Sequence, residues 1–176
     1  RILAAAAEAG VTNVAMEASS HGLDQRRLDG VRVMAGAFTN FSQDHLDYHA
    51  GFDEYFAAKA LLFNHILDAG DGAVINVDSE RGRQMADIAR DRDLVLTTIG
   101  TAEGNDFRIL GQRYDATGQE LRFSYAGQTH LVRLNLIGGF QAENVLAAAG
   151  LAIASGDDPA VVLTALPHLE TVRGRM

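Results

Sequence analysis

The stretch AVINVDSERGRQMADIARDRDLVLTTI (Ala73–Ile99) decides the fold. Short apolar runs at 73–77 and 94–99 predict two buried strands, and the residues between them predict a helix over Ser79–Asp91. Strands that alternate with helices in this way are typical of a parallel sheet covered by helices on both faces. The sequence therefore predicts the α/β class, with a mostly parallel sheet flanked by helices.

The rest of the chain extends this alternation. Between Phe107 and Leu136, the segments FRIL, ELRFSYAG and HLVRLNL are separated by turns that contain glycine, and they predict a small antiparallel β subdomain. An Ala-rich helix that ends at Gly156 follows, and Asp158 with Pro159 predicts the start of another. The remaining predicted elements are helix Arg1–Ala9, strand Val11–Glu17, strand Met34–Thr39 and helix Phe52–Leu67.

The composition is that of one ordinary globular domain. Of the 176 residues, 47% are hydrophobic, which is enough for one substantial core. The formal net charge of -8 argues against a nucleic-acid partner, because phosphate contacts require clustered Lys and Arg. No apolar run reaches the roughly 20 residues of a membrane span. The absence of cysteine suits a cytoplasmic protein, and we expect a small-molecule ligand.

The first stretch with possible chemistry is VAMEASSHGLDQRR, residues 14–27. Glu17 stands at the end of a predicted strand, and in an open α/β sheet ligands bind at that end. A carboxylate there can hold Mg²⁺, which prefers oxygen ligands beside substrate phosphates. The alternative is a solvated glutamate in a loop, with Ser19 and Ser20 as ordinary turn residues.

The second stretch, FTNFSQDHLDYH at residues 38–49, also follows a predicted strand. Asp44, His45, Asp47 and His49 are crowded into six positions, which favours metal binding. The alternative is a polar turn that caps the next helix, with Asp53 as an acidic residue near the helix start.

Lys59 falls within the apolar face of that next helix. At 100° per residue it lies close to the middle of a face formed by Phe52, Tyr55, Phe56, Leu62, Phe63 and Ile66. A buried ammonium is costly unless it is paired or chemically changed. Lys59 either faces a metal and its phosphates, or carries CO₂ as a carbamate, or is a lysine whose stem alone is buried.

The third stretch is LIGGFQAENVLAAAG, residues 136–150. Gly138 and Gly139 precede a helix and can contact a phosphate, although a plain turn explains them equally. The chain contains no G-x-x-x-x-G-K-[ST] phosphate-binding loop.

Together, the motifs MEASSHGLDQRR, FTNFSQDHLDYH, YFAAKALLF, AVINVDS and GGFQAENVLAAAG resemble, in this order, the central domain of the Mur ligases. The resemblance covers nearly the whole chain. It is greatest to the members that add the third amino acid, meso-diaminopimelate or L-lysine, to UDP-N-acetylmuramoyl-L-alanyl-D-glutamate in peptidoglycan synthesis. It implies a P-loop-type central domain over residues 1–176, with the phosphate-binding loop before it and the amino-acid-selecting domain after it.

This resemblance also implies a reaction and a set of site residues. The reaction is ATP-dependent amide formation through an acyl phosphate. Gln141 departs from the Asn or His that is usual at its position in the family. The implied roles are Mg²⁺ ligation by Glu17 and His45, a carbamylated Lys59 that holds a second Mg²⁺, substrate binding by Ser19, Gln25 and Arg27, and nucleotide contact by Asn40 and Asn144.

Three other interpretations remain open from the sequence. A sister ATP-dependent ligase such as a folylpolyglutamate synthetase shares the chemistry but should lack the SSHGLDQ motif. A metal-dependent phosphoesterase would use Asp44, His45 and His49 around a water nucleophile. The chain by itself can also be a binding module only. No obligate protein partner is indicated.

Overall fold

The computed structural model describes residues 2–41 and 51–170. Within these residues, one six-stranded sheet has the order β1-β2-β3-β4-β5-β6. The first four strands pair in parallel and the last three pair in antiparallel fashion, so the predicted mostly parallel sheet with an antiparallel β part is confirmed. The strands are β1 (Ala35–Phe38), β2 (Gly72–Asn76), β3 (Val95–Gly100), β4 (Phe107–Asp115), β5 (Gly118–Tyr125) and β6 (Gln128–Leu134).

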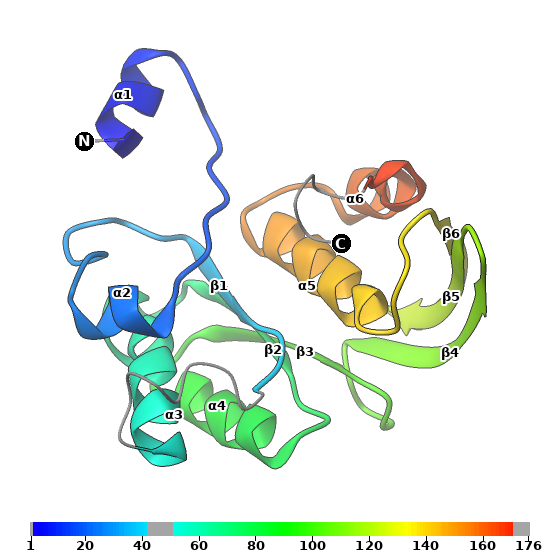
Figure 1. Ribbon diagram of the computed structural model, residues 1–176, viewed down its shortest axis with the longest axis horizontal. Coiled ribbons are helices and arrows are strands. Elements are labelled where there is room, and N and C mark those ends of the chain that lie inside the picture. The colour runs from blue at the N-terminus through cyan, green and yellow to red at the C-terminus, as the bar shows by residue number, and fades with distance from the viewer. Residues whose placement is uncertain (1, 42–50, 171–176) are drawn as a thin grey trace.

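Helices cover both faces of the parallel part (Figure 1). On one side lie α2 (Ser20–Asp24), α3 (Phe52–Leu61) with a π-helical turn (Leu62–Ile66), and α4 (Glu80–Asp91). On the other lie α5 (Gln141–Ala154), α6 (Pro159–Ala165) and a 3-10 turn (Leu166–His168). The helices predicted over 52–67 and 79–91, and the two predicted near the end of the chain, are confirmed.

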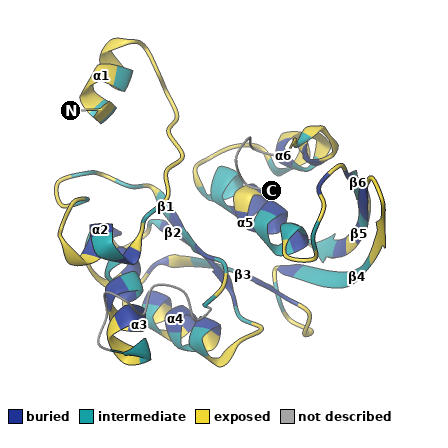
Figure 2. Ribbon diagram, viewed as in Figure 1, coloured by how far each residue is buried: buried dark blue, intermediate teal, exposed yellow. Residues whose placement is uncertain are grey.

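Strand β2 is the centre of the core, and all five of its residues are buried. Alternate side chains of a strand point to opposite faces. Accordingly Val74 packs in the cluster of α5, whereas Ala73 and Ile75 pack in the cluster of α3 and α4. Figure 2 shows this buried layer between the helices. Burying a Val or Ile side chain stabilises the fold by about 1.5–3 kcal/mol, so the apolar run that predicts β2 also explains its central position.

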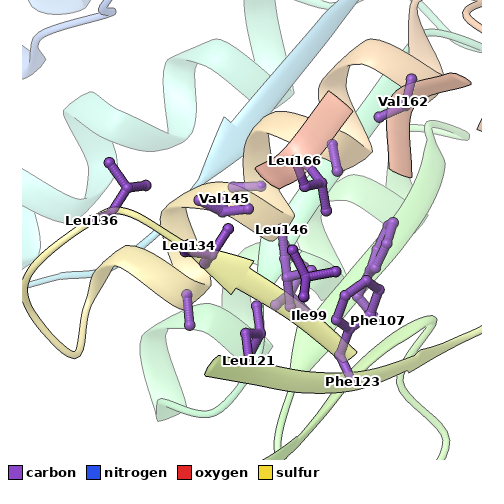
Figure 3. Packing of buried hydrophobic residues seen from close by; sticks show 14 of the residues in the cluster. Ile99, Phe107, Leu121, Phe123, Leu134, Leu136, Val145, Leu146, Val162 and Leu166 are labelled. Carbon is purple, nitrogen blue, oxygen red and sulfur yellow. The ribbon is translucent and has the colours of Figure 1, made fainter. Parts of the chain in front are cut away.

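The antiparallel strands form a second packing surface for α5 (Figure 3). Phe107 of β4 and Phe123 of β5 are fully buried and contact the cluster that includes Leu146 of α5. Their rings are tilted at a centroid distance of 6.2 Å. The β subdomain is therefore joined to the parallel part through one continuous core, and it can hold the start of α5 in place.

The prediction of a strand over Val11–Glu17 is wrong. These residues form no strand and pair with none of the described strands, and Val11, Val14 and Met16 are about half exposed. Among the described strands, β1 lies at the edge of the sheet and pairs with β2 alone. A strand is stabilised by hydrogen bonds to a neighbouring strand, and this segment pairs with none of the described strands. Helix α1 (Ile2–Glu8) forms as predicted, buries no residue and projects from the body (Figure 1).

Candidate active site

Helix α2 places the first group of predicted site residues. Ser19 is its N-cap, and the Ser19 Oγ accepts a hydrogen bond from the Gly22 backbone N–H at 3.1 Å. A serine at this position satisfies one of the unpaired N–H groups of the helix start. Leu23 of the same helix is buried in the cluster that contains Phe56 of α3. This anchor brings the segment that carries exposed Glu17 and Ser19 onto the helix that carries Lys59.

The turn after α2 is held by backbone hydrogen bonds to α2 and by contacts of its exposed side chains. The Arg27 guanidinium donates to the Gln25 Oε1 at 2.6 Å, and both residues are exposed. Arg26 adopts a positive φ of 57°, and its Nη1 lies 2.6 Å from the His65 Nε2 of the π-helical turn. Asp29 approaches the same imidazole at 3.4 Å. The structure thus places the Gln25 and Arg27 side chains in contact and leaves both exposed, while their role in substrate binding stays a prediction.

Lys59 is half-buried rather than buried, which corrects the expectation from helix phase. Its neighbours Ala58 and Ala60 are buried, and its Nζ lies 5.0 Å from the ring centroid of Tyr55. An ammonium over an aromatic face is stabilised electrostatically. The half-buried Lys59 therefore has Tyr55 as a partner, and the desolvation penalty is smaller than the sequence suggested.

A second cation, Arg81, contacts the aromatic cluster that includes Tyr55, and sequence reasoning missed it. Phe41, which follows β1, stacks on Tyr55 at 4.9 Å between ring centroids. Arg81, in the first turn of α4, lies over the Phe56 ring at 4.8 Å and pairs with Asp53. The side chain of Arg81 is 32% exposed, so it is accessible at this surface. In sequence it looks like an ordinary solvated helix residue.

The second region of the candidate site is the start of α5. Asn144 lies in the first turn of α5 and is half-buried, whereas Asn40 is exposed just after β1. The two come from neighbouring elements, because α5 packs against β1. Burial, and to a lesser degree the charge of Asp78, raises the pKa of the neighbouring Glu143. Gly138 has a φ of 114°, which a side chain would disfavour, so the backbone conformation explains why glycine stands here, and the phosphate contact stays a prediction.

Metal ligation stays a prediction. His45, together with Asp44, Asp47 and His49, lies outside the described residues. Within the described ranges, no group of three or more His, Cys, Asp or Glu side chains is arranged to hold a metal ion. A convergence of Glu17, His45 and Lys59 is therefore not tested by the geometry.

No helix within residues 2–41 and 51–170 has the length and apolar character to cross a membrane.

Comparison with known proteins identifies the family. Residues 1–152 match the Mur ligase middle domain. The chain belongs to the Mur ligase family. The resemblance noted from the sequence motifs is thereby confirmed at the level of the family, and the parallel sheet with its antiparallel extension is a Mur ligase middle-domain fold.

Mur ligases with one specificity are prominent among the relatives. The UDP-N-acetylmuramoyl-L-alanyl-D-glutamate--2,6-diaminopimelate ligase of Caulobacter vibrioides is 47% identical over 99% of this chain and 36% of its own length. That of Bradyrhizobium diazoefficiens is 45% identical over 97% of this chain and 36% of its own. A solved ligase of the same name has a TM-score of 0.86 and 33% identity, covering 97% of this chain and 35% of its own. The chain thus spans about a third of these proteins.

Proposed function

We propose that this chain is the central, ATP-binding part of a ligase that adds an amino acid to UDP-N-acetylmuramoyl-L-alanyl-D-glutamate. The observation that carries the proposal is the 47% identity, over 99% of the chain, to a relative named for that reaction with 2,6-diaminopimelate. Since the chain spans about 36% of that relative, the phosphate-binding loop and the domain that selects diaminopimelate or L-lysine belong, in this proposal, to other parts of the full-length protein.

The turn after α2 is the proposed binding site of the UDP-linked peptide. Arg27 has an exposed guanidinium that already donates to the Gln25 amide. A planar guanidinium suits bidentate pairing with a carboxylate or phosphate of the substrate. Ser19 is the N-cap of α2, and Gln25 is the C-cap at its other end. The three side chains therefore offer donors on one exposed segment, where they can orient the D-glutamate carboxylate.

The proposed Mg²⁺ ligands are Glu17, His45 and a carbamylated Lys59. The exposed Glu17 carboxylate suits a hard cation, but the Lys59 ammonium repels one and becomes a suitable ligand only after it adds CO₂. The half-buried position of Lys59 leaves its Nζ accessible for that addition. Bound Mg²⁺ would neutralise charge between the substrate carboxylate and the γ-phosphate of ATP, as acyl phosphate formation requires.

Asn40 and Asn144 are the proposed nucleotide contacts. Asn40 lies at the carboxyl end of β1, and ligands of open α/β sheets bind at this edge. Asn144 lies in the first turn of α5, whose backbone N–H groups favour anions. An enzyme that uses ATP and a UDP-linked precursor works where both are made, so we propose a cytoplasmic location.

The test is product formation by the full-length protein. With ATP, Mg²⁺ and UDP-N-acetylmuramoyl-L-alanyl-D-glutamate, phosphate release should require an added amino acid, and a panel of diaminopimelate and L-lysine should show which one is joined. Phosphate release that requires folate and glutamate instead would favour a folylpolyglutamate synthetase. Hydrolysis of nitrophenyl phosphate with Mn²⁺, without the UDP-linked peptide, would favour a phosphoesterase and contradict the proposal.

A further inference from the structure

Gln119 of β5 is a fully buried amide, with 0% of its surface exposed. Its Nε2 donates to two backbone oxygens of the segment that leads into α5, namely Leu136 at 3.3 Å and Gly138 at 3.0 Å. Only the NH₂ end of an amide can face two carbonyl oxygens, so these contacts determine its orientation. One side chain of the β subdomain thereby holds the turn in front of α5.

This arrangement is costly for the fold. Among the described residues, the Gln119 Oε1 is buried without a hydrogen-bond partner. A buried polar atom left unpaired destabilises a protein, whereas an apolar side chain of similar size would fill the same space without that penalty. Packing alone therefore does not explain a glutamine here. The effect specific to its amide is to restrain Leu136 and Gly138.

The restraint passes directly into α5. The Gly138 carbonyl that accepts from Gln119 also accepts from the backbone N–H of Gln141, the first residue of α5, at 3.1 Å. One turn further, the Asn144 N–H donates to the Phe140 carbonyl at 3.2 Å. The position of Asn144 therefore depends on a helix start whose first acceptor is held by a buried side chain.

A second glutamine holds the same turn from the surface. The Gln112 Nε2 of β4 donates to the Gly139 carbonyl at 3.4 Å. Gly118, beside Gln119, lies against the residues that precede the turn, since a Cβ on it would approach the Leu134 carbonyl oxygen to 2.1 Å. Two adjacent strands thus contact the turn at Gly138 and Gly139 through two side-chain amides.

We propose that Gln119 is a positioning residue for the nucleotide: by holding Gly138 it orients the first turn of α5 and hence Asn144. This inference rests on the proposed contact between Asn144 and the nucleotide. Gln119 itself is fully buried, so in this proposal it acts through the turn and not by direct contact with the nucleotide. Its loss should therefore weaken nucleotide binding without changing recognition of the UDP-linked peptide.

The test uses the full-length protein and the Gln119→Met variant, which keeps the volume and removes both donors. We expect the KM for ATP to rise about tenfold, equivalent to about 1.4 kcal/mol, with the KM for the UDP-linked peptide unchanged. Gln128→Met is the matched control. Gln128 is an exposed residue at the start of β6 and lies at the opposite end of the β5–β6 pair from Gln119, so this change should leave both KM values unchanged. An unchanged KM for ATP in Gln119→Met overturns the inference.

Two further measurements separate this inference from the proposed function. Amide hydrogen exchange at residues 138–141 of the free protein should be faster in Gln119→Met, and unchanged exchange would also overturn the inference. Asn144→Ala tests the nucleotide contact by itself. If Asn144→Ala raises the KM for ATP and Gln119→Met does not, positioning fails alone. If neither variant raises it, the nucleotide assignment fails.

The surface glutamine provides a second variant in case Gln119→Met does not fold. Gln112→Met removes the weaker bond to Gly139 at a half-buried position. It should raise the KM for ATP about twofold to threefold, in the same direction as Gln119→Met. A rise confined to the UDP-linked peptide would contradict the inference.

Discussion

The turn after α2 and the turn before α5 are held in opposite ways. After α2, exposed Arg27 and Gln25 bond to each other, and a ligand can replace that contact. Before α5, the amide of buried Gln119 holds the Gly138 carbonyl from within the core. A segment held by exposed side chains is open to rearrangement, whereas a segment held by buried groups is already formed. We therefore expect the substrate side to adjust on binding and the nucleotide side to be preformed.

The largest expected effect is at Lys59 of α3, the helix that contacts α2. In the full-length protein, Lys59→Ala should lower the turnover rate by about 10²–10³-fold, because the carbamate that is proposed to hold Mg²⁺ cannot form. Acetate should restore part of the rate by occupying the vacated position. The measurements are the turnover rates of wild type and Lys59→Ala and the dependence of each rate on added bicarbonate.

Lys59→Arg is the matched control, because it keeps a cation that can lie over Tyr55 but cannot form the carbamate. It should be as inactive as Lys59→Ala. Wild-type turnover in Lys59→Arg, with no response to bicarbonate, would mean that the ammonium over Tyr55 is the whole role of this residue.

The next largest effect is expected on the nucleotide side, in stability. Gly118→Ala should lower the free energy of unfolding by about 2–4 kcal/mol, because the new Cβ would lie 2.1 Å from the Leu134 carbonyl oxygen and φ at this glycine is 154°. Urea unfolding measures it. Gly111→Ala in β4 is the control, since no atom lies within 4 Å of its Cβ position. Equal stability of the two variants would show that the turn before α5 is not closely packed.

A smaller effect should distinguish the two turns in catalysis. Arg27→Lys keeps the charge but removes the planar fork, so the KM for the UDP-linked peptide should rise about tenfold while that for ATP is unchanged. Steady-state kinetics with each substrate varied in turn measures this. Equal increases for both substrates would indicate that Arg27 only supports the fold.

The smallest effect concerns the ion pair at the end of the β subdomain. Arg133 donates to both carboxylate oxygens of Asp115, at 2.6 and 2.8 Å, and these bonds hold the pKa of Asp115 well below its usual range. A lowered pKa stabilises the folded state above the ordinary aspartate pKa of about 3.9. That contribution is lost as the pH falls through the lowered folded value.

The measurement is the pH dependence of thermal unfolding for wild type and Asp115→Asn. The wild type should unfold at a slightly higher temperature near neutral pH, and the difference should shrink below about pH 4. High salt should also reduce it, because the pair is exposed. A difference that is the same at low pH and near neutrality would rule out the ion pair as its cause.

Local patterns predicted most of the fold. The β2–α4–β3 unit follows from two apolar runs and a Ser79 cap, whose Oγ accepts from the Gly82 N–H at 2.9 Å. Pairing between distant strands has no local signal, and the prediction for Val11–Glu17 fails for that reason. The cluster around His45 lies outside the described residues, so that prediction is not tested.

Two side-chain contacts, one in each turn, show why only part of the site could be predicted. Gln25 and Arg27 are two residues apart, and a short motif places them together. Gln119 and its acceptors are 17 and 19 residues apart and meet only because β6 returns the chain to β5. In sequence, Gln119 looks like a polar residue of an exposed strand face. Its role depends on tertiary packing.

The most direct test of this division between the two turns is calorimetric titration of the full-length protein with UDP-N-acetylmuramoyl-L-alanyl-D-glutamate and, separately, with a non-hydrolysable ATP analogue. The account predicts that Arg27→Lys weakens only the UDP-linked peptide and that Gln119→Met weakens only the nucleotide, each about tenfold. If each variant weakens both ligands to the same extent, the two turns do not act separately and the account is contradicted.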